Sequence, residues 1–261
     1  MEVPIVGRDD ELGQLRAALA AASGGAGRLL LVSGEPGIGK TRLTTAVTEM
    51  AGEYGVPVAA GFAIDDPGMP PLWPWLEVSR SVPALADVLG GASSSAGEAG
   101  LLEDSSSARF VMFAAASRVL VGAAAERGLL VVLEDLQWAD RTSLLLLRHL
   151  AGELSRSRLL VMATFRETTG REAAGPPLAE LLPALLRAGG RPVRLTGLSR
   201  PDIARWLRLM HAGGDVDGLA GCGRAPAATR CSSGCSWSAG RPPLTAGCAA
   251  SPSCGTWSWP S

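Results

Sequence analysis

Short apolar runs alternate with helical patterns between residues 28 and 210. Continuous Leu and Val runs are typical of strands buried on both faces of a parallel sheet, whereas apolar residues three or four positions apart predict helices. We expect strands at 28–33, 56–61, 129–133, 158–164 and 193–195, and helices at 40–52, 108–127, 142–154, 178–187 and from a Ser199 cap to about 210. This alternation predicts an α/β fold, a doubly wound parallel sheet with helices on both faces.

Several local features refine this picture. Residues 90–107 are rich in Gly, Ser and Ala and are expected to form a surface loop with some disorder. Asp140 is a plausible N-cap for the helix after it. Trp73 and Trp75 flank Pro74 and favour a packed loop over a ligand-stacking platform. The helix over 108–127 is expected to place four residues in the core: Phe110, Phe113, Val119 and Leu120.

Composition narrows the class of protein. The 261 residues are 47% hydrophobic and 19% charged, as in globular proteins, and the net charge of −1 provides no basic field for nucleic acid. The N-terminus carries acids and has no apolar core typical of a secretory signal. No apolar run approaches the roughly 18 residues of a membrane span. We therefore expect a cytoplasmic protein with no membrane contact and no direct nucleic-acid binding.

One segment carries a phosphate-binding pattern. It matches G-x-x-x-x-G-K-[ST] in full with Gly34, Glu35, Pro36, Gly37, Ile38, Gly39, Lys40 and Thr41. Glycines let successive backbone N–H groups point at phosphate oxygens, and the following helix presents its positive end to the same anion. Lys40 is the only lysine among 24 basic residues. We expect Lys40 to reach the β- and γ-phosphates of ATP and the Thr41 hydroxyl to coordinate Mg²⁺.

A second pattern supplies carboxylates. The apolar run 129–133 ends in Glu134 and Asp135, which is the Walker B pattern of a buried strand delivering acids beside the phosphates. One acid is expected to hold Mg²⁺ through water, and the other to orient or deprotonate the attacking water. The residues alone do not assign these two roles. Arg166 follows the strand 158–164 and is either a γ-phosphate sensor or a solvated loop arginine.

Residues 221–261 differ from the rest of the chain. They contain no Asp or Glu, and Leu244 is their only aliphatic residue larger than alanine, so a disordered tail is expected. All five cysteines lie at or after Cys222. Their spacings are irregular and include no C-x-x-C, which argues against a zinc site.

The ordered set of motifs resembles a known family. The set comprises 6–12 (Val-Gly-Arg-Asp-Asp-Glu-Leu), 34–43 (the phosphate-binding segment with Arg42), 70–75, 133–140 (Leu-Glu-Asp-Leu-Gln-Trp-Ala-Asp), 164–166 and 195–200. It resembles the origin-recognition-complex-like AAA ATPase domain of bacterial signalling (STAND-type) ATPases, most of all the large ATP-binding regulators of the LuxR family. The resemblance implies adenine near Val6, Gly7 and Arg8, Arg166 as sensor 1, and a helical lid beginning near Ser199.

The resemblance breaks after the expected lid begins. Where the family has Gly-Gly-Asn-Pro and an apolar run, residues 225–237 differ, and shifting the reading frame by one base restores a compatible sequence. We infer a frame slip between about His211 and Arg224. The expected organisation is an ATPase domain at 1–197, the start of a lid at 198–220 and an aberrant tail at 221–261.

The favoured function is a signalling-type ATPase that binds ATP with Mg²⁺ and hydrolyses it slowly, as a fragment of a multidomain transcriptional regulator. Its partners are ATP and ADP, with self-association or the intact regulator as further possibilities. A P-loop phosphotransferase acting on a small molecule and a non-functional truncated relic are the alternatives. A GTPase is disfavoured, because the usual guanine-reading motif needs a second lysine.

Overall fold

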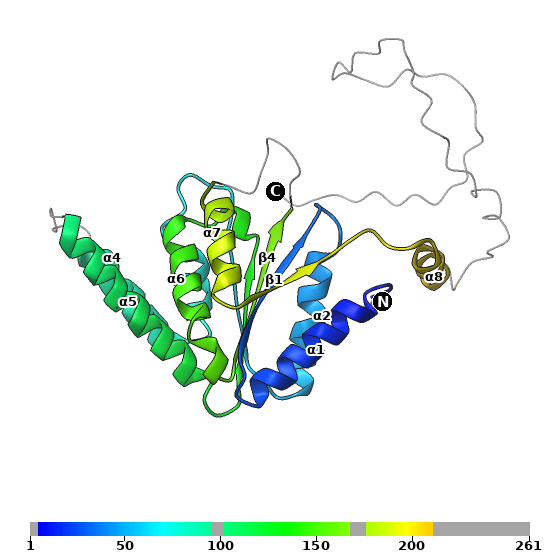
Figure 1. The fold of residues 1–261 in the computed structure, drawn as a ribbon, viewed down its shortest axis with the longest axis horizontal. Coiled ribbons are helices and arrows are strands. Elements are labelled where there is room, and N and C mark those ends of the chain that lie inside the picture. The colour runs from blue at the N-terminus through cyan, green and yellow to red at the C-terminus, as the bar shows by residue number, and fades with distance from the viewer. Residues whose placement is uncertain (1–4, 96–101, 168–175, 211–261) are drawn as a thin grey trace, which may run out of the picture. The chain divides into compact units, whose positions relative to one another are not determined.

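The computed structural model describes residues 5–95, 102–167 and 176–210, which all belong to one unit of the chain, Met1–Gly214. Five parallel strands form one sheet in the order β2-β3-β4-β1-β5 (Figure 1). Their bounds are β1 (Arg28–Gly34), β2 (Val58–Phe62), β3 (Leu129–Glu134), β4 (Leu159–Arg166) and β5 (Gly190–Arg194). The predicted α/β fold with a parallel sheet is confirmed.

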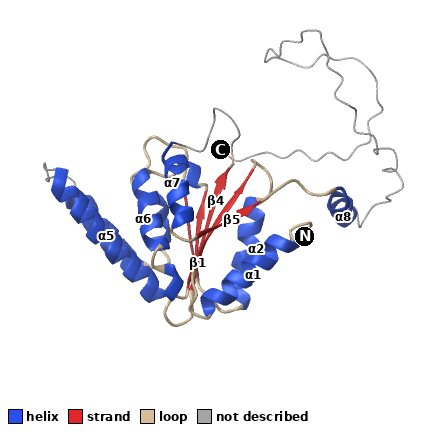
Figure 2. Ribbon diagram, viewed as in Figure 1, coloured by secondary structure: helices blue, strands red, loops and turns tan. Residues whose placement is uncertain are grey.

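Helices cover both faces of this sheet (Figure 2). One face carries α1 (Asp9–Ser23) and α2 (Lys40–Glu53). The other face carries α3 (Trp73–Ser79), α4 (Pro83–Ser95), α5 (Leu102–Ala123), α6 (Arg141–Ala151) and α7 (Pro176–Arg187). The short 3₁₀ turns η1 (Leu136–Trp138) and η2 (Leu154–Arg156) follow β3 and α6, and α8 (Arg200–Met210) follows β5. No helix in the described ranges is long and apolar enough to cross a membrane.

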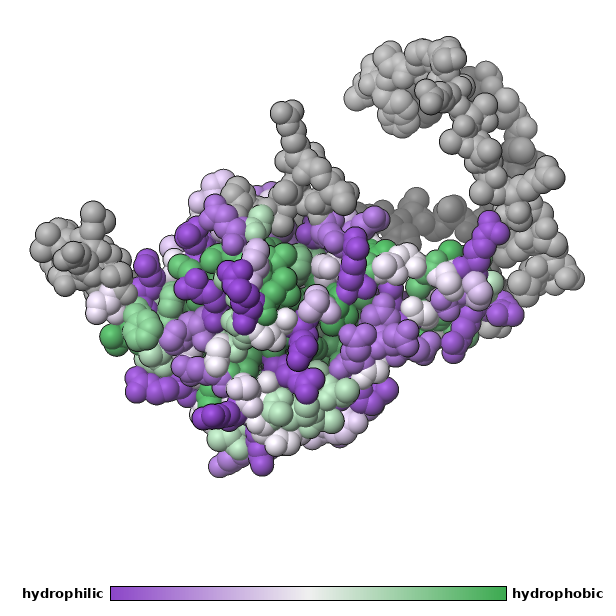
Figure 3. Space-filling model, viewed as in Figure 1, coloured by the Kyte–Doolittle hydropathy of each residue, from purple (hydrophilic) through white to green (hydrophobic). Residues whose placement is uncertain are grey.

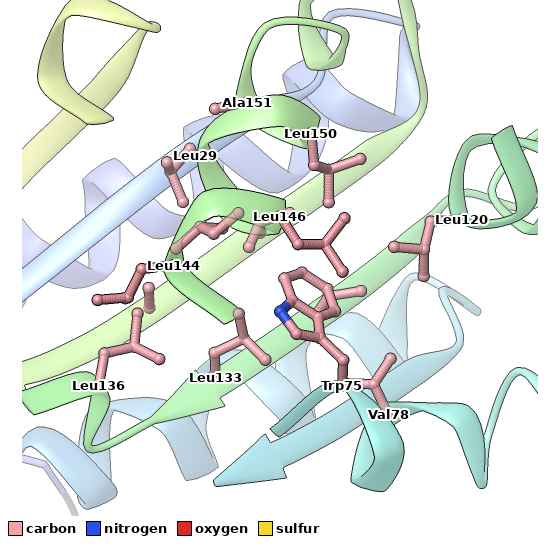
Figure 4. Close-up of a cluster of buried hydrophobic side chains, with 14 of the residues drawn as sticks. Leu29, Trp75, Val78, Leu120, Leu133, Leu136, Leu144, Leu146, Leu150 and Ala151 are labelled. Atoms are coloured by element: carbon pink, nitrogen blue, oxygen red, sulfur yellow. The ribbon is translucent and has the colours of Figure 1, made fainter. Parts of the chain in front are cut away.

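Alternation along the strands divides the core into two clusters. In β1, Leu30 and Val32 pack with α1 and α2, whereas Leu29 and Leu31 belong to the cluster on the opposite face. The same alternation holds in β3 and β4, so these strands are buried on both faces, as their continuous apolar runs predict. In the larger cluster the fully buried Trp75 ring lies among leucines of β3 and α6 (Figure 4).

The strand order decides which loops can meet. β4, which comes later in the chain, is hydrogen-bonded to both β1 and β3 and so separates them. In this register Gly34 lies opposite Arg166, and Leu133 lies opposite Ala163. Because all the strands are parallel, the residues that follow β1, β3 and β4 emerge at one edge of the sheet.

Two predictions about the 90–127 region are wrong. The expected loop at 90–107 is helical at both ends, because α4 continues to Ser95 and α5 begins at Leu102. Packing of α4 against α5 overrides the weak helix propensity of Gly and Ser. Phe110 is 62% exposed rather than buried, and its ring lies edge-on to His149, with centroids 5.4 Å apart. Phe110 lies one turn before Phe113, where the buried stripe of α5 begins.

Asp140 joins two segments as well as capping α6. Its Oδ2 accepts the Ser143 N–H at 3.0 Å, which confirms the predicted cap. Its Oδ1 accepts the backbone N–H of Leu72 at 3.0 Å, and Leu72 has a left-handed φ of 65°. Trp75 donates its indole N–H to the Ser143 carbonyl at 3.1 Å. The Pro-rich stretch is therefore packed as expected, but it starts helix α3 instead of forming only a loop.

The segment after β5 agrees with the expected helix start. Ser199 precedes α8, and its Oγ accepts the Asp202 N–H at 3.3 Å, as an N-cap does. The tail predicted at 221–261 and the inferred frame slip lie outside the described residues.

We expect Asp140→Ala to lower the free energy of unfolding by about 1–2 kcal/mol, because the helix loses its cap and the Leu72 N–H loses its acceptor. Urea denaturation of the full chain measures this change. Asp65→Ala is the matched control, since Asp65 is exposed on the loop after β2 and should leave stability unchanged. Equal stability of both variants would contradict the bridging role of Asp140.

Candidate nucleotide-binding site

The phosphate-binding segment forms a tight turn between β1 and α2. Gly37 and Gly39 have φ values of 76° and 105°, which disfavour residues with a side chain. Gly34 ends β1 in a crowded position, where an added Cβ would lie 2.8 Å from Ile38 Cγ2 and 3.1 Å from Leu195 Cβ. Lys40 begins α2 immediately after the turn. The strand, turn and helix expected for this motif are all present, and the N-terminal end of α2 faces the loop.

Lys40 is held against its own loop. Its Nζ donates to the carbonyl oxygens of Gly34 at 2.9 Å and Glu35 at 3.0 Å, and the residue is only 9% exposed. Burial lowers the pKa of the Lys40 ammonium, Asp135 acts in the opposite direction, and Arg166 lowers it further. The three side chains thus lie within electrostatic reach, although they come from three different segments.

Glu134 is the last residue of β3 and faces α2. Its Oε1 lies 2.6 Å from the hydroxyl of Thr44, which is one helical turn after Lys40 and is buried. The Thr44 Oγ1 also lies 2.8 Å from the Thr41 carbonyl, and its single proton can serve only one acceptor at a time. Thr44 thereby connects the acid of β3 to the first turn of α2. It was not among the predicted site residues, although the i, i+4 spacing from Lys40 places it on the same helix face.

Asp135 has an unusual backbone conformation, with a left-handed φ of 57°. Its N–H donates to the Thr164 hydroxyl of β4 at 3.2 Å. Its Oδ1 lies 3.9 Å from Nε of Arg166, and these side chains are 43% and 42% exposed. Asp135 and Arg166 are thus neighbours at the edge of the sheet, on either side of the β3–β4 boundary.

Gln137 also belongs to this cluster, although no sequence pattern predicted a role for it. It is buried in η1, and its side chain contacts both Asp135 and the backbone of Arg166. A single glutamine in the sequence is only a weak indication of a buried functional position, because glutamine is usually exposed.

A small cavity of about 100 Å³ lies beside the phosphate-binding turn. The residues lining it come from the N-terminal segment, the turn, the start of α2, Leu198 and α8. Five residues of the predicted set line it: Val6, Arg8, Ile38, Gly39 and Arg42. Trp206, which no sequence pattern indicated, lines it as well. Trp206 is 37% exposed, and α8 also exposes apolar side chains at Ile203 and Leu209; apolar surface is visible on this helix in Figure 3.

Arg8 and Gly7 have structural contacts of their own. The Arg8 guanidinium donates to the Ile38 carbonyl at 3.0 Å and forms a 3.1 Å ion pair with Glu11, so it braces the phosphate-binding turn. Gly7 has a φ of 67°, and an added Cβ would lie 2.6 Å from Asp202 Cγ. The N-terminal segment therefore meets the turn on one side and the start of α8 on the other.

The structure brings most of the predicted site residues together at one edge of the sheet. The turn 34–41 starts at the last residue of β1, Glu134 ends β3 and is followed by Asp135, and Arg166 ends β4. Thr41 and Arg42 are exposed at the start of α2. In the described ranges, no group of three or more His, Cys, Asp or Glu residues is placed to hold a metal ion.

A parallel α/β sheet with a complete phosphate-binding turn and an acid pair at the end of a buried strand defines a P-loop NTPase. The family comparison is more specific and identifies residues 4–162 as an AAA ATPase domain. This match covers more than half of the 261 residues, so the chain belongs to this family of nucleotide-binding domains. No curated protein matches the chain.

The chain is also similar to several solved structures. The Walker-type ATPase PABY2304 of Pyrococcus abyssi is 16% identical with a TM-score of 0.49, over 81% of this chain and 60% of that one. The STAND protein PH0952 of Pyrococcus horikoshii, which has a tetratricopeptide repeat sensor, is 16% identical with a TM-score of 0.48. The match covers 84% of this chain and 27% of PH0952. AMPPCP-bound DnaA from Aquifex aeolicus is 15% identical with a TM-score of 0.44. The match covers 84% of this chain and 56% of DnaA. The chain spans 60% or less of the length of these three proteins.

We expect Gly34→Ala to distort the phosphate-binding turn and to lower the free energy of unfolding by about 1–3 kcal/mol through overpacking. The control is Gly13→Ala on α1, where an added Cβ meets nothing within 4 Å. That change should raise stability by about 0.5–1 kcal/mol, because alanine favours a helix interior. Thermal denaturation of both variants measures the difference, and the same sign for both would contradict the crowding at Gly34.

Proposed function

We propose that this domain binds ATP with Mg²⁺ at the edge of the sheet where β1, β3 and β4 end, and hydrolyses it slowly. The observation that carries the proposal is the convergence of Lys40, the acid pair and Arg166 on one place. A phosphate chain needs cations and N–H groups, and a metal that bridges it needs oxygen ligands. This edge supplies both kinds of group.

The phosphates are proposed to lie in the turn 34–41. Phosphate oxygens are stronger acceptors for the Lys40 ammonium than the carbonyls of Gly34 and Glu35, so Lys40 would exchange these neutral partners for charged ones. The new contacts favour the charged ammonium, which offsets the lowering of its pKa by burial.

The donor set suits Mg²⁺. The Thr41 hydroxyl and the carboxylates of Glu134 and Asp135 are hard oxygen ligands, and Mg²⁺ is usually bound through one or two carboxylates, substrate phosphates and water. We propose Asp135 as the metal-side acid, because it lies beside Arg166 and its side chain is 43% exposed. Glu134, held by Thr44, is then the acid that orients the attacking water.

The base is proposed to occupy the cavity beside the turn. Val6 and Ile38 offer apolar walls, and the Trp206 indole offers a face for stacking. Arg8 contributes by holding the Ile38 carbonyl and thereby the shape of the turn. Since α8 supplies Trp206, bound nucleotide would contact the helix that leads out of the ATPase domain.

We also propose that the domain acts as a nucleotide-dependent switch within a larger regulator of the LuxR type. Membership of the AAA ATPase family and the motifs at 6–12, 133–140 and 195–200 support this context. In such a switch, ATP and ADP would favour different arrangements of α8 and of the segments attached to it.

We expect Lys40→Met to weaken Mg-ATP binding about 10- to 100-fold, because hydrogen bonds to charged groups contribute about 1.5–3 kcal/mol. Methionine keeps much of the buried aliphatic volume, so the fold should persist. Equilibrium binding of a fluorescent ATP analogue measures the loss. Arg28→Ala is the control, since it removes an exposed cation at the opposite end of β1. Unchanged affinity in Lys40→Met would contradict the phosphate assignment.

We expect Trp206→Ala to weaken ATP and ADP by a similar factor of about tenfold, in keeping with about 1–3 kcal/mol for a base stacked on an aromatic ring. Inorganic triphosphate, which has no base, should bind this variant as well as the parent protein. Competition against the same fluorescent analogue measures all three ligands. Ile203→Ala on the same helix is the control, because Ile203 does not line the cavity. Equal loss for triphosphate would place Trp206 elsewhere.

A further inference from the structure

Gln137 is one of the few buried polar side chains in the described part of the chain. It is 5% exposed and lies in η1, directly after the acid pair. A buried carboxamide costs free energy unless its donors and acceptor find partners. Its contacts therefore show what this position does for the site around it.

Two hydrogen bonds fix the Gln137 carboxamide. Its Nε2 donates to Asp135 Oδ1 at 2.8 Å, and its Oε1 accepts the backbone N–H of Arg166 at 3.0 Å. A carboxylate can only accept and a backbone N–H can only donate, so one orientation of the amide satisfies both partners. The side chain consequently connects the acid after β3 to the last residue of β4.

These contacts control the direction of the Asp135 carboxylate. Asp135 is in the left-handed region, where an ordinary residue is strained unless its surroundings hold it. Oδ1 faces Gln137 and, at 3.9 Å, Nε of Arg166. No hydrogen bond to Oδ2 occurs within residues 5–95, 102–167 and 176–210. One carboxylate oxygen is thus fixed toward β4, and the other remains able to face a metal or water.

The distance between Asp135 and Arg166 supports the same interpretation. Without the Gln137 donor, Asp135 Oδ1 would lose the hydrogen bond that holds it, while Nε of Arg166 would remain 3.9 Å away. The two exposed side chains could then approach from 3.9 Å into a closed ion pair. Such a pair would turn the carboxylate toward Arg166 and also engage the guanidinium.

We propose that Gln137 is a positioning residue that sets the direction of the Asp135 carboxylate and keeps Arg166 from closing on it. The proposal rests on the Mg-ATP site described above. Gln137 touches neither phosphate nor metal. Its action on hydrolysis passes through Asp135 and Arg166, so it should affect turnover more than nucleotide binding.

Two variants separate the two hydrogen bonds. Gln137→Glu has nearly the same shape and retains an oxygen that can accept the Arg166 N–H, but an ionised carboxylate cannot donate to Asp135. Gln137→Leu loses both contacts. Gln14→Leu is the control, because Gln14 is exposed on α1 and takes no part in the hydrogen bonds to Asp135 and Arg166.

The first readout needs no nucleotide. Hydrogen exchange at the Arg166 amide, followed by NMR in the full chain, should become at least about tenfold faster in Gln137→Leu and change little in Gln137→Glu. The second readout is steady-state hydrolysis. Both variants should lose about 10- to 100-fold in kcat, as is usual for residues that orient metal ligands, with KM nearly unchanged.

Three results would overturn the proposal. One is unchanged exchange at Arg166 in Gln137→Leu. Another is a parental kcat in Gln137→Glu, which would show that Gln137 connects the two segments but does not orient Asp135 for hydrolysis. The third is a loss confined to KM. If the parent protein bound no nucleotide, the proposed function would fail, and the exchange measurement would still decide whether the amide holds Arg166.

Discussion

The pairing of β1 with β4, which sets Gly34 opposite Arg166, is the constraint on which the site depends. β4 lies between the strand of the phosphate-binding turn and the strand of the acid pair, so Arg166 emerges between them. In this parallel sheet, a shift of β4 by one residue would turn its side chains to the opposite face and separate Thr164 from Asp135. Val161 and Ala163 pack in one cluster and Leu160 and Met162 in the other, so such a shift would place side chains of a different size in each close-packed cluster.

Contacts between segments then hold each functional group in place. Thr44 connects Glu134 to α2, Gln137 connects Asp135 to β4, and Arg8 connects the N-terminal segment to the phosphate-binding turn. Lys40 is oriented by the carbonyls of its own loop, and its burial lowers the pKa of its ammonium. A side chain that is already oriented loses less conformational entropy when it binds a ligand, so such preorganisation favours phosphate binding.

The predictable parts of the site are those encoded by contiguous residues. The strand, turn and helix around Lys40 and the buried strand that ends at Glu134 follow from local periodicity and glycine placement, and the structure has both. The α4–α5 pair, the inserted position of β4 and the exposure of Phe110 depend on contacts between distant segments, which local patterns do not report. Gln137 and Trp206 escaped prediction for the same reason. Their residue types carry weak signals, and only the fold brings them to Asp135 and to the cavity.

Phosphates and Mg²⁺ are proposed to bind where β1, β3 and β4 end. A crystal structure of the full chain with Mg²⁺ and a non-hydrolysable ATP analogue tests this proposal most directly. We expect Lys40 Nζ to leave the carbonyls of Gly34 and Glu35 for the β- and γ-phosphates. We also expect Mg²⁺ beside Thr41 and the acid pair. Nucleotide bound away from the turn, or Lys40 still hydrogen-bonded to its loop beside bound phosphates, would show that the site is assigned incorrectly.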